Sequence, residues 1–144
     1  MTKIKSKYFT LDELTYSATA DIYDIDNNPN DEIIENLIEL MNVLDTIREL
    51  WGKPIRVLSG YRCKELNSAV GGSKTSAHLN GFAADIKPFN NDMESFIQVV
   101  KEWAKTNDFD QILIENNSLG GHWLHFGYKS PKGEFRYQIK KLKV

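Results

Sequence analysis

All three histidines of this 144-residue chain lie in two short segments, one of which also carries an aspartate. His78 and Asp85 stand in the first segment, and His122 and His125 stand in the second. Two imidazoles and one carboxylate are the ligands that a catalytic Zn²⁺ takes from a protein, with a fourth position left open for water. The two segments therefore predict a zinc site with hydrolytic chemistry.

The surroundings of the first two candidates favour ligation. Asp85 interrupts the apolar stretch 83–86, which has the pattern of a buried strand. A buried carboxylate without a partner would cost several kcal/mol or take up a proton, so it needs a cation or hydrogen bonds. Gly81 and the two alanines after it are small, which lets the chain turn back tightly from His78. Both ligands can then reach one point.

The second segment separates its two histidines by strand alternation. In a strand, His125 shares a face with Trp123 and Gly127, while Leu124 and Phe126 point to the other face. His125 would then project into a cleft. His122 cannot share this face in a straight strand. We therefore predict His78, Asp85 and His125 as ligands of one Zn²⁺ per chain, and His122 as a neighbouring or catalytic group.

Length and composition are typical of a single globular domain. The length fits one domain over residues 1–144, and 41% apolar residues are enough for a core. A net charge of −2 is unlike the basic footprint of a nucleic-acid binder. We find no apolar run long enough to span a membrane and no signal peptide in Met1–Ser6. With the single Cys63, these features predict synthesis in a reducing cytoplasm, and we expect a monomer without an internal disulfide.

The order of elements predicts an α+β fold. A capping box at Thr10 opens a first helix to about Ala18, and a second capping box at Asn91 opens a helix to about Lys105. Apolar residues three and four apart predict a long helix, and other patterns predict a short helix and five strands. These further elements are a long helix at 31–50, a short helix at 64–69, and strands at 55–58, 83–86, 111–115, 123–128 and 135–142. The sheet is predicted to be mainly antiparallel, with the helices of the N-terminal half packed on it.

The pattern Ser-x-His-x-x-Gly-x-Ala-x-Asp at 76–85, with Trp-x-His at 123–125, resembles the zinc D-alanyl-D-alanine carboxypeptidases and their L-alanyl-D-glutamate endopeptidase relatives. Upstream, the similarity extends to Ser-Gly-Tyr-Arg at 59–62 and Val-Gly-Gly-Ser at 70–73. The family includes bacterial cell-wall enzymes and phage endolysins. The resemblance covers about half of the chain, and it implies a hedgehog/DD-peptidase-like fold and peptidoglycan stem peptides as substrate.

The resemblance also implies roles for single residues. His78, Asp85 and His125 match the zinc ligands of the family. Arg62 matches an arginine beside the reacting carbonyl, where a fixed cation stabilises a developing oxyanion. A surface salt bridge is its alternative role. Ser76 matches a hydroxyl that contacts the substrate, and its alternative role is that of a cap in the loop.

The general base is where the chain departs from its relatives. Many of them place Asp or Glu three residues before the last ligand, and here that position is His122. Some relatives look similar in using histidine, and an imidazole can accept the proton of a water and pass it to the leaving amine. Glu115, at the end of the preceding predicted strand, is the second candidate. Glu115 could instead orient a ligand or the base.

The sequence thus predicts a zinc-dependent hydrolase of a peptide bond in peptidoglycan stems, of the carboxypeptidase or the endopeptidase type. A phage or prophage origin would explain how an enzyme without a signal peptide reaches the cell wall after release or delivery. The alternative is an inactive, zinc-stabilised binding or structural module, for example in a virion. His122 in place of a carboxylate is the feature that favours this alternative.

Overall fold

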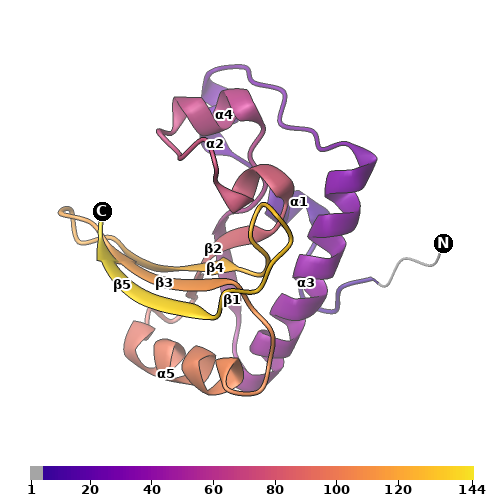
Figure 1. Cartoon of the computed structure of the whole chain (residues 1–144). Helices are drawn as coiled ribbons and strands as arrows, with labels where there is room; N and C mark the ends of the chain where they lie inside the picture. The colour runs from indigo at the N-terminus through magenta and orange to yellow at the C-terminus, as the bar shows by residue number, and fades with distance from the viewer. Residues whose placement is uncertain (1–4) are drawn as a thin grey trace.

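The computed structural model describes residues 5–144, and the prediction about a leader in Met1–Ser6 falls mostly outside them. Eleven elements follow one another along this part of the chain (Figure 1). The helices are α1 (Leu11–Thr15), α2 (Ala18–Ile22), α3 (Asp31–Trp51), α4 (Lys64–Ala69), the 3₁₀ segment η1 (Ala77–Asn80) and α5 (Met93–Ala104). The strands are β1 (Ile55–Ser59), β2 (Ala83–Pro88), β3 (Gln111–Asn116), β4 (His122–Gly127) and β5 (Gln138–Lys143).

The five strands form one sheet in the order β1-β2-β4-β3-β5. Neighbours pair antiparallel except for β3 and β5, which are parallel. The α+β class and the mainly antiparallel sheet are therefore confirmed. The register puts Asp85 of β2 directly opposite His125 of β4, and His125 in turn opposite Leu113 of β3. One row across the sheet thus carries two of the predicted ligands.

The core lies between one face of the sheet and the helices α3 and α5. In Figure 1, α5 runs beneath the sheet and α3 crosses one end of it. Residues that alternate along the strands, such as Ile86, Leu124 and Phe126, are fully buried on this face. They join Phe96 of α5 and Leu44 of α3 in one apolar cluster. The opposite face of the middle strands, which carries Asp85 and His125, is left for the site.

Two local predictions about helices need correction. The first helix ends at Thr15 instead of Ala18, and a separate helix, α2, starts after Ser17, whose hydroxyl accepts the backbone N–H of Ala20. The cap of α5 is Asp92, which accepts from the N–H of Ser95, and Asn91 adopts a left-handed conformation before it. Ser17 thus caps a new helix where one continuous helix was predicted, and at α5 two neighbouring polar side chains could cap, which local pattern alone does not decide.

The last strand also differs from its prediction. It begins at Gln138 instead of Phe135, and it pairs in parallel with β3. Residues 129–137 form a long connection from β4 to the far edge of the sheet, because β3 lies between β4 and β5 and the chain must pass around its end. Among residues 5–144, no helix has the length and apolarity needed to span a bilayer.

The packing of α5 on the sheet predicts a large cost for removing Phe96. Its ring is fully buried and packs edge-on against Trp51, with the ring centroids 5.3 Å apart. Phe96→Ala should lower the free energy of unfolding by about 3–5 kcal/mol, because it leaves a cavity. Denaturant unfolding measures this change. Phe89→Ala is the matched control, since Phe89 is 61% exposed and should change stability by about 0.5 kcal/mol or less. Equal effects would contradict the described core.

Candidate metal centre

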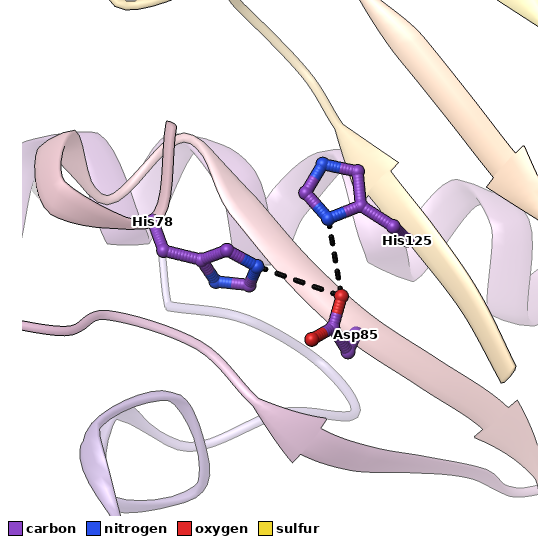
Figure 2. A group of neighbouring side chains, drawn as sticks. All are labelled: His78, Asp85 and His125. Carbon is purple, nitrogen blue, oxygen red and sulfur yellow. Dashed lines mark hydrogen bonds and ion pairs between the residues drawn. The ribbon is translucent and has the colours of Figure 1, made fainter. Parts of the chain in front are cut away.

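The predicted ligands His78, Asp85 and His125 converge on one point (Figure 2). They come from η1, β2 and β4, and one ligand atom from each lies within 4.8 Å of the others. His78 is 2% exposed, and the side chains of Asp85 and His125 are 19% and 13% exposed. The cluster is therefore sheltered but open on one side.

His78 is held by a backbone carbonyl. Its Nδ1 lies 2.7 Å from the carbonyl oxygen of Gly60, and this contact is buried. A carbonyl can only accept, so Nδ1 carries the proton and donates it, which leaves a lone pair on Nε2. Burial lowers the pKa of His78 and favours the neutral ring. A metal-binding histidine needs this tautomer and this neutral state.

Gly60 is held in turn by the N-terminal part of the chain. A Cβ at this position would collide with the backbone carbonyl of Leu14 in α1, so only glycine allows this approach. The next residue, Tyr61, donates its N–H to the same carbonyl of Leu14 at 2.7 Å. Asn27 then ties Tyr61 and Cys63 to the end of α1 through three hydrogen bonds of its side-chain amide. Contacts of Leu14 and Asn27 thus help to fix the position of the His78 ring.

Asp85 bridges the two imidazoles. Its Oδ1 lies 3.1 Å from Nδ1 of His125 and 3.5 Å from Nε2 of His78. Burial alone would raise the pKa of Asp85, but the hydrogen bond with His125 and the nearby His78 ring outweigh burial and hold the pKa far below its usual range. The carboxylate is therefore ionised, as a metal ligand must be.

These distances fit zinc. In a tetrahedral site with bonds of about 2.0–2.1 Å, neighbouring ligand atoms stand about 3.3–3.4 Å apart. The two distances from Asp85 lie on either side of this value. Two neutral nitrogens and one ionised oxygen are the ligands of a zinc site that keeps a position free. The three ligand atoms can therefore hold one metal ion.

The cluster lies in a cleft of about 580 Å³ that Glu115 also lines. Glu115 stands two residues beyond Leu113 on β3, and its Oε1 accepts the indole N–H of Trp123 at 3.1 Å. Burial raises the pKa of Glu115, and the charge of Asp85 raises it further. The hydrogen bond with Trp123 thus holds Oε1, and Oε2 can exchange a proton.

Arg62 lines the same cleft from the segment after β1. It is half-buried, and its Nε has no hydrogen-bond partner within residues 5–144. Burial lowers its pKa, and the nearby carboxylates of Asp85 and Glu115 oppose this shift. The alternative role in a surface salt bridge finds no support, since no carboxylate of the described residues pairs with Arg62. A half-buried cation that lines the cleft beside the metal-ligand cluster suits a substrate group that is negatively charged.

Ser76 caps η1, and its position is also compatible with the other role that the sequence left open. Its hydroxyl caps η1 by accepting the N–H of His78 at 3.2 Å. Ser76 also lines the cleft, half-buried, so it can contact a substrate. Gly81 ends η1 in a left-handed conformation and packs against Ile33 and Leu37 of α3. The tight return from His78 to Asp85 therefore depends on Gly81.

His122 is not brought to the cluster. It is the first residue of β4 and shares the face of Leu124 and Phe126, opposite that of His125. It lines a second cavity, of about 740 Å³, between the sheet and α5. Alternation along β4 thus keeps His122 away from the ligands, as the sequence indicated. The same geometry places His122 away from a water at the cluster, whereas Glu115 lines the cleft of the cluster.

The sequence did not single out two residues that organise this site. The Gly60 carbonyl orients His78, and no residue type signals a backbone acceptor. Trp123 fixes Glu115, and its place beside His125 on one strand face was visible in the alternation. The sequence did not predict the register of β3 against β4, which sets Glu115 opposite Trp123.

A family model described as Peptidase M15 matches residues 7–120. The fold and the His-Asp-His cluster define the class of a metallopeptidase, and the chain belongs to the Peptidase M15 family, whose members are zinc-dependent peptidases. The match includes His78 and Asp85 and ends before β4, so the structure alone brings His125 to the site. No curated protein matches the chain.

The geometry predicts that alanine variants of the three histidines differ in the zinc they retain. Wild-type protein should bind one zinc per chain. His78→Ala and His125→Ala should retain far less, because each removes a ligand atom from the cluster. His122→Ala is the matched control and should retain the metal of the wild type, since His122 lies on the other face. Elemental analysis after dialysis measures this. Loss of zinc from the His122 variant would contradict the ligand set.

Proposed function

We propose that this protein hydrolyses a peptide bond in peptidoglycan stem peptides, with one zinc ion held by His78, Asp85 and His125. The observation that supports this most is the position of Glu115 and Arg62 in the cleft of the ligand cluster. Family membership supports zinc-dependent peptidase activity. The substrate class is our inference from the resemblance of the motifs, and it would place the site of action at the cell wall, after release or delivery of the enzyme.

In this proposal, Glu115 transfers the proton during hydrolysis. When bound, zinc supplies Lewis-acid polarisation of the scissile carbonyl and acidifies the attacking water. Glu115 accepts the proton of that water on the oxygen that Trp123 does not hold, and it later gives the proton to the leaving amine. A carboxylate whose pKa is raised by burial is a better base for this transfer than an exposed one.

Arg62 stabilises the negative charge that develops on the carbonyl oxygen. Its guanidinium is half-buried, where electrostatic interactions are stronger than in water. The guanidinium lines the cleft close to the carboxylates of Asp85 and Glu115, and no carboxylate of the described residues pairs with it. A fixed donor of this kind costs little reorganisation during the reaction.

The shape of the surface favours an endopeptidase over a carboxypeptidase. A second cleft, of about 460 Å³, meets the first one, since Arg62 and Asp85 line both. It continues along β1 and carries the exposed side chains of Tyr16, Leu58 and Val70. Substrate can therefore extend on both sides of the ligand cluster, whereas a carboxypeptidase needs a long subsite on one side only.

Product analysis tests both the hydrolytic activity and the preference for an internal bond. Zinc-loaded protein is incubated with purified peptidoglycan and with a synthetic stem pentapeptide, and the products are identified by mass spectrometry. We expect fragments from cleavage of an internal bond and none of them in the presence of chelator. Release of free D-alanine alone would establish a carboxypeptidase instead. No cleavage by zinc-loaded protein would favour the alternative of an inactive binding or structural module.

The assignment of the base predicts a pair of contrasting variants. Glu115→Gln should lower turnover by ~10²- to 10⁴-fold and leave the zinc content unchanged, because the amide keeps its bond to Trp123 but cannot accept a proton. His122→Ala should stay within a few-fold of wild type, since His122 lines the other cavity. Hydrolysis rate and zinc content are measured on the same preparations. A large loss at His122 with a mild one at Glu115 would reverse the assignment.

A further inference from the structure

The connection between β4 and β5 forms one wall of the catalytic cleft. Ser130, Lys132, Glu134 and Arg136 all line the cavity that contains the metal ligands. These residues lie beyond the range that the family model matches. The metal site and the proposed catalytic groups do not use them. Their side chains are therefore free to select the substrate.

This connection is a fixed structure. Ser130 is 3% exposed, and its hydroxyl accepts the backbone N–H groups of Lys132 and Glu134 at 3.2 and 3.0 Å. The N–H of Ser130 donates in return to the carbonyl of Glu134 at 2.9 Å. The ring of Phe135 packs against Tyr128 with centroids 5.4 Å apart. The wall is thus organised before any substrate binds.

Arg136 is the most firmly held charged group in this wall. Its Nε and Nη2 donate to the two carboxylate oxygens of Asp110 at 2.6 and 2.8 Å. Asp110 is 1% exposed and also accepts the backbone N–H of Arg136 at 3.2 Å. A guanidinium has five N–H donors. Two of them bind Asp110, and no other hydrogen-bond partner in the described residues takes the remaining three.

The free donors of Arg136 can meet a ligand. The side chain is 43% exposed although its partner is buried, so the edge away from Asp110 faces the cleft that Arg136 lines. The nearby formal charges of Lys132 and Glu134 cancel, as do those of Arg136 and Asp110. Attraction at this point therefore depends on directed hydrogen bonds, for which a planar guanidinium suits a carboxylate. A fixed guanidinium also loses little side-chain entropy on binding.

The register of the sheet places Arg136 at a useful distance from the metal ligands. Its partner Asp110 directly precedes β3, and the row of Asp85 and His125 crosses β3 at Leu113. These three residues of strand correspond to about 10 Å. Glu115 lies on the other side of that row. An extended peptide that reacts at the metal would bring groups two or three residues from the scissile bond to Arg136.

We propose that Arg136 determines specificity by binding a carboxylate of the substrate two or three residues from the scissile bond. This inference rests on the proposed function, because it assumes a stem peptide. Such peptides offer two carboxylates, one at the C-terminus and one on the α-carbon of the γ-linked D-glutamate, and the bond that is cleaved decides which of them lies at this distance. Arg136 recognises one of them, and the experiment distinguishes the two.

The test measures binding, so that it does not depend on turnover. Zinc-loaded Glu115→Gln protein is titrated in a calorimeter with L-Ala-γ-D-Glu-L-Lys-D-Ala-D-Ala and with two analogues, each of which has one of the two carboxylates converted to the amide. We expect one amide to weaken binding by about 10- to 100-fold, the range for a hydrogen-bonded charged group. The other amide should have a small effect and thereby identify the bound carboxylate.

The same titrations are repeated after removal of the guanidinium. Arg136→Gln is combined with Asp110→Asn, so that no buried carboxylate is left unpaired. This protein should bind the pentapeptide as weakly as the sensitive amide and should no longer distinguish the two. Arg136→Lys keeps the charge but loses the planar donors, and it decides the question if the double change does not fold. Arg48→Gln, whose side chain packs over Tyr8 outside the cleft, is the matched control and should discriminate like the parent.

Each result is decisive. Equal sensitivity to amidation with and without Arg136, or no measurable binding of any peptide, would overturn the proposal. Hydrolysis by the protein with Glu115 intact is measured separately. Discrimination that depends on Arg136 without cleavage would leave this binding site in place and refute the proposed function. Cleavage without discrimination that depends on Arg136 would support the proposed function and refute the role of Arg136.

Discussion

The hydrogen bond from His78 to the Gly60 carbonyl is the interaction on which the site depends. It is buried, 2.7 Å long, and joins the end of β1 to the 3₁₀ segment. It selects the tautomer of the ring and aims Nε2 at Asp85. The backbone of Gly60 packs directly on Leu14, so α1 and the Asn27 contacts support the site although they carry no ligand.

The second constraint is the cost of burying Asp85. A buried carboxylate is tolerated only with partners, and here two imidazoles at 3.1 and 3.5 Å supply them. Antiparallel pairing sets Asp85 opposite His125, so β2 and β4 fix one of these contacts without any loop. His78 supplies the other from outside the sheet. The cluster therefore couples the sheet to the segment after α4.

Most of the ligand set could be predicted from the sequence, because it depends on residue type and local period. Asp85 was conspicuous as an acid in an apolar strand, and alternation separated His125 from His122. The parallel pairing of β5 could not be predicted, because it is set by contacts across the sheet. Asp110 and Arg136 are 26 residues apart, and neither residue indicates the other. The position of Glu115 in the cleft, opposite Trp123, likewise depended on the register of β3 against β4.

The central claim is that His78, Asp85 and His125 hold one zinc ion while the Gly60 carbonyl holds His78. A crystal structure of the zinc-loaded protein, with anomalous data at the zinc edge, tests it most directly. We expect a single peak at about 2.0–2.2 Å from His78 Nε2, His125 Nδ1 and a carboxylate oxygen of Asp85. The contact from His78 Nδ1 to Gly60 should be retained. A zinc ion bound through His78 Nδ1, or bound by His122 on the other face of the sheet, would contradict the account.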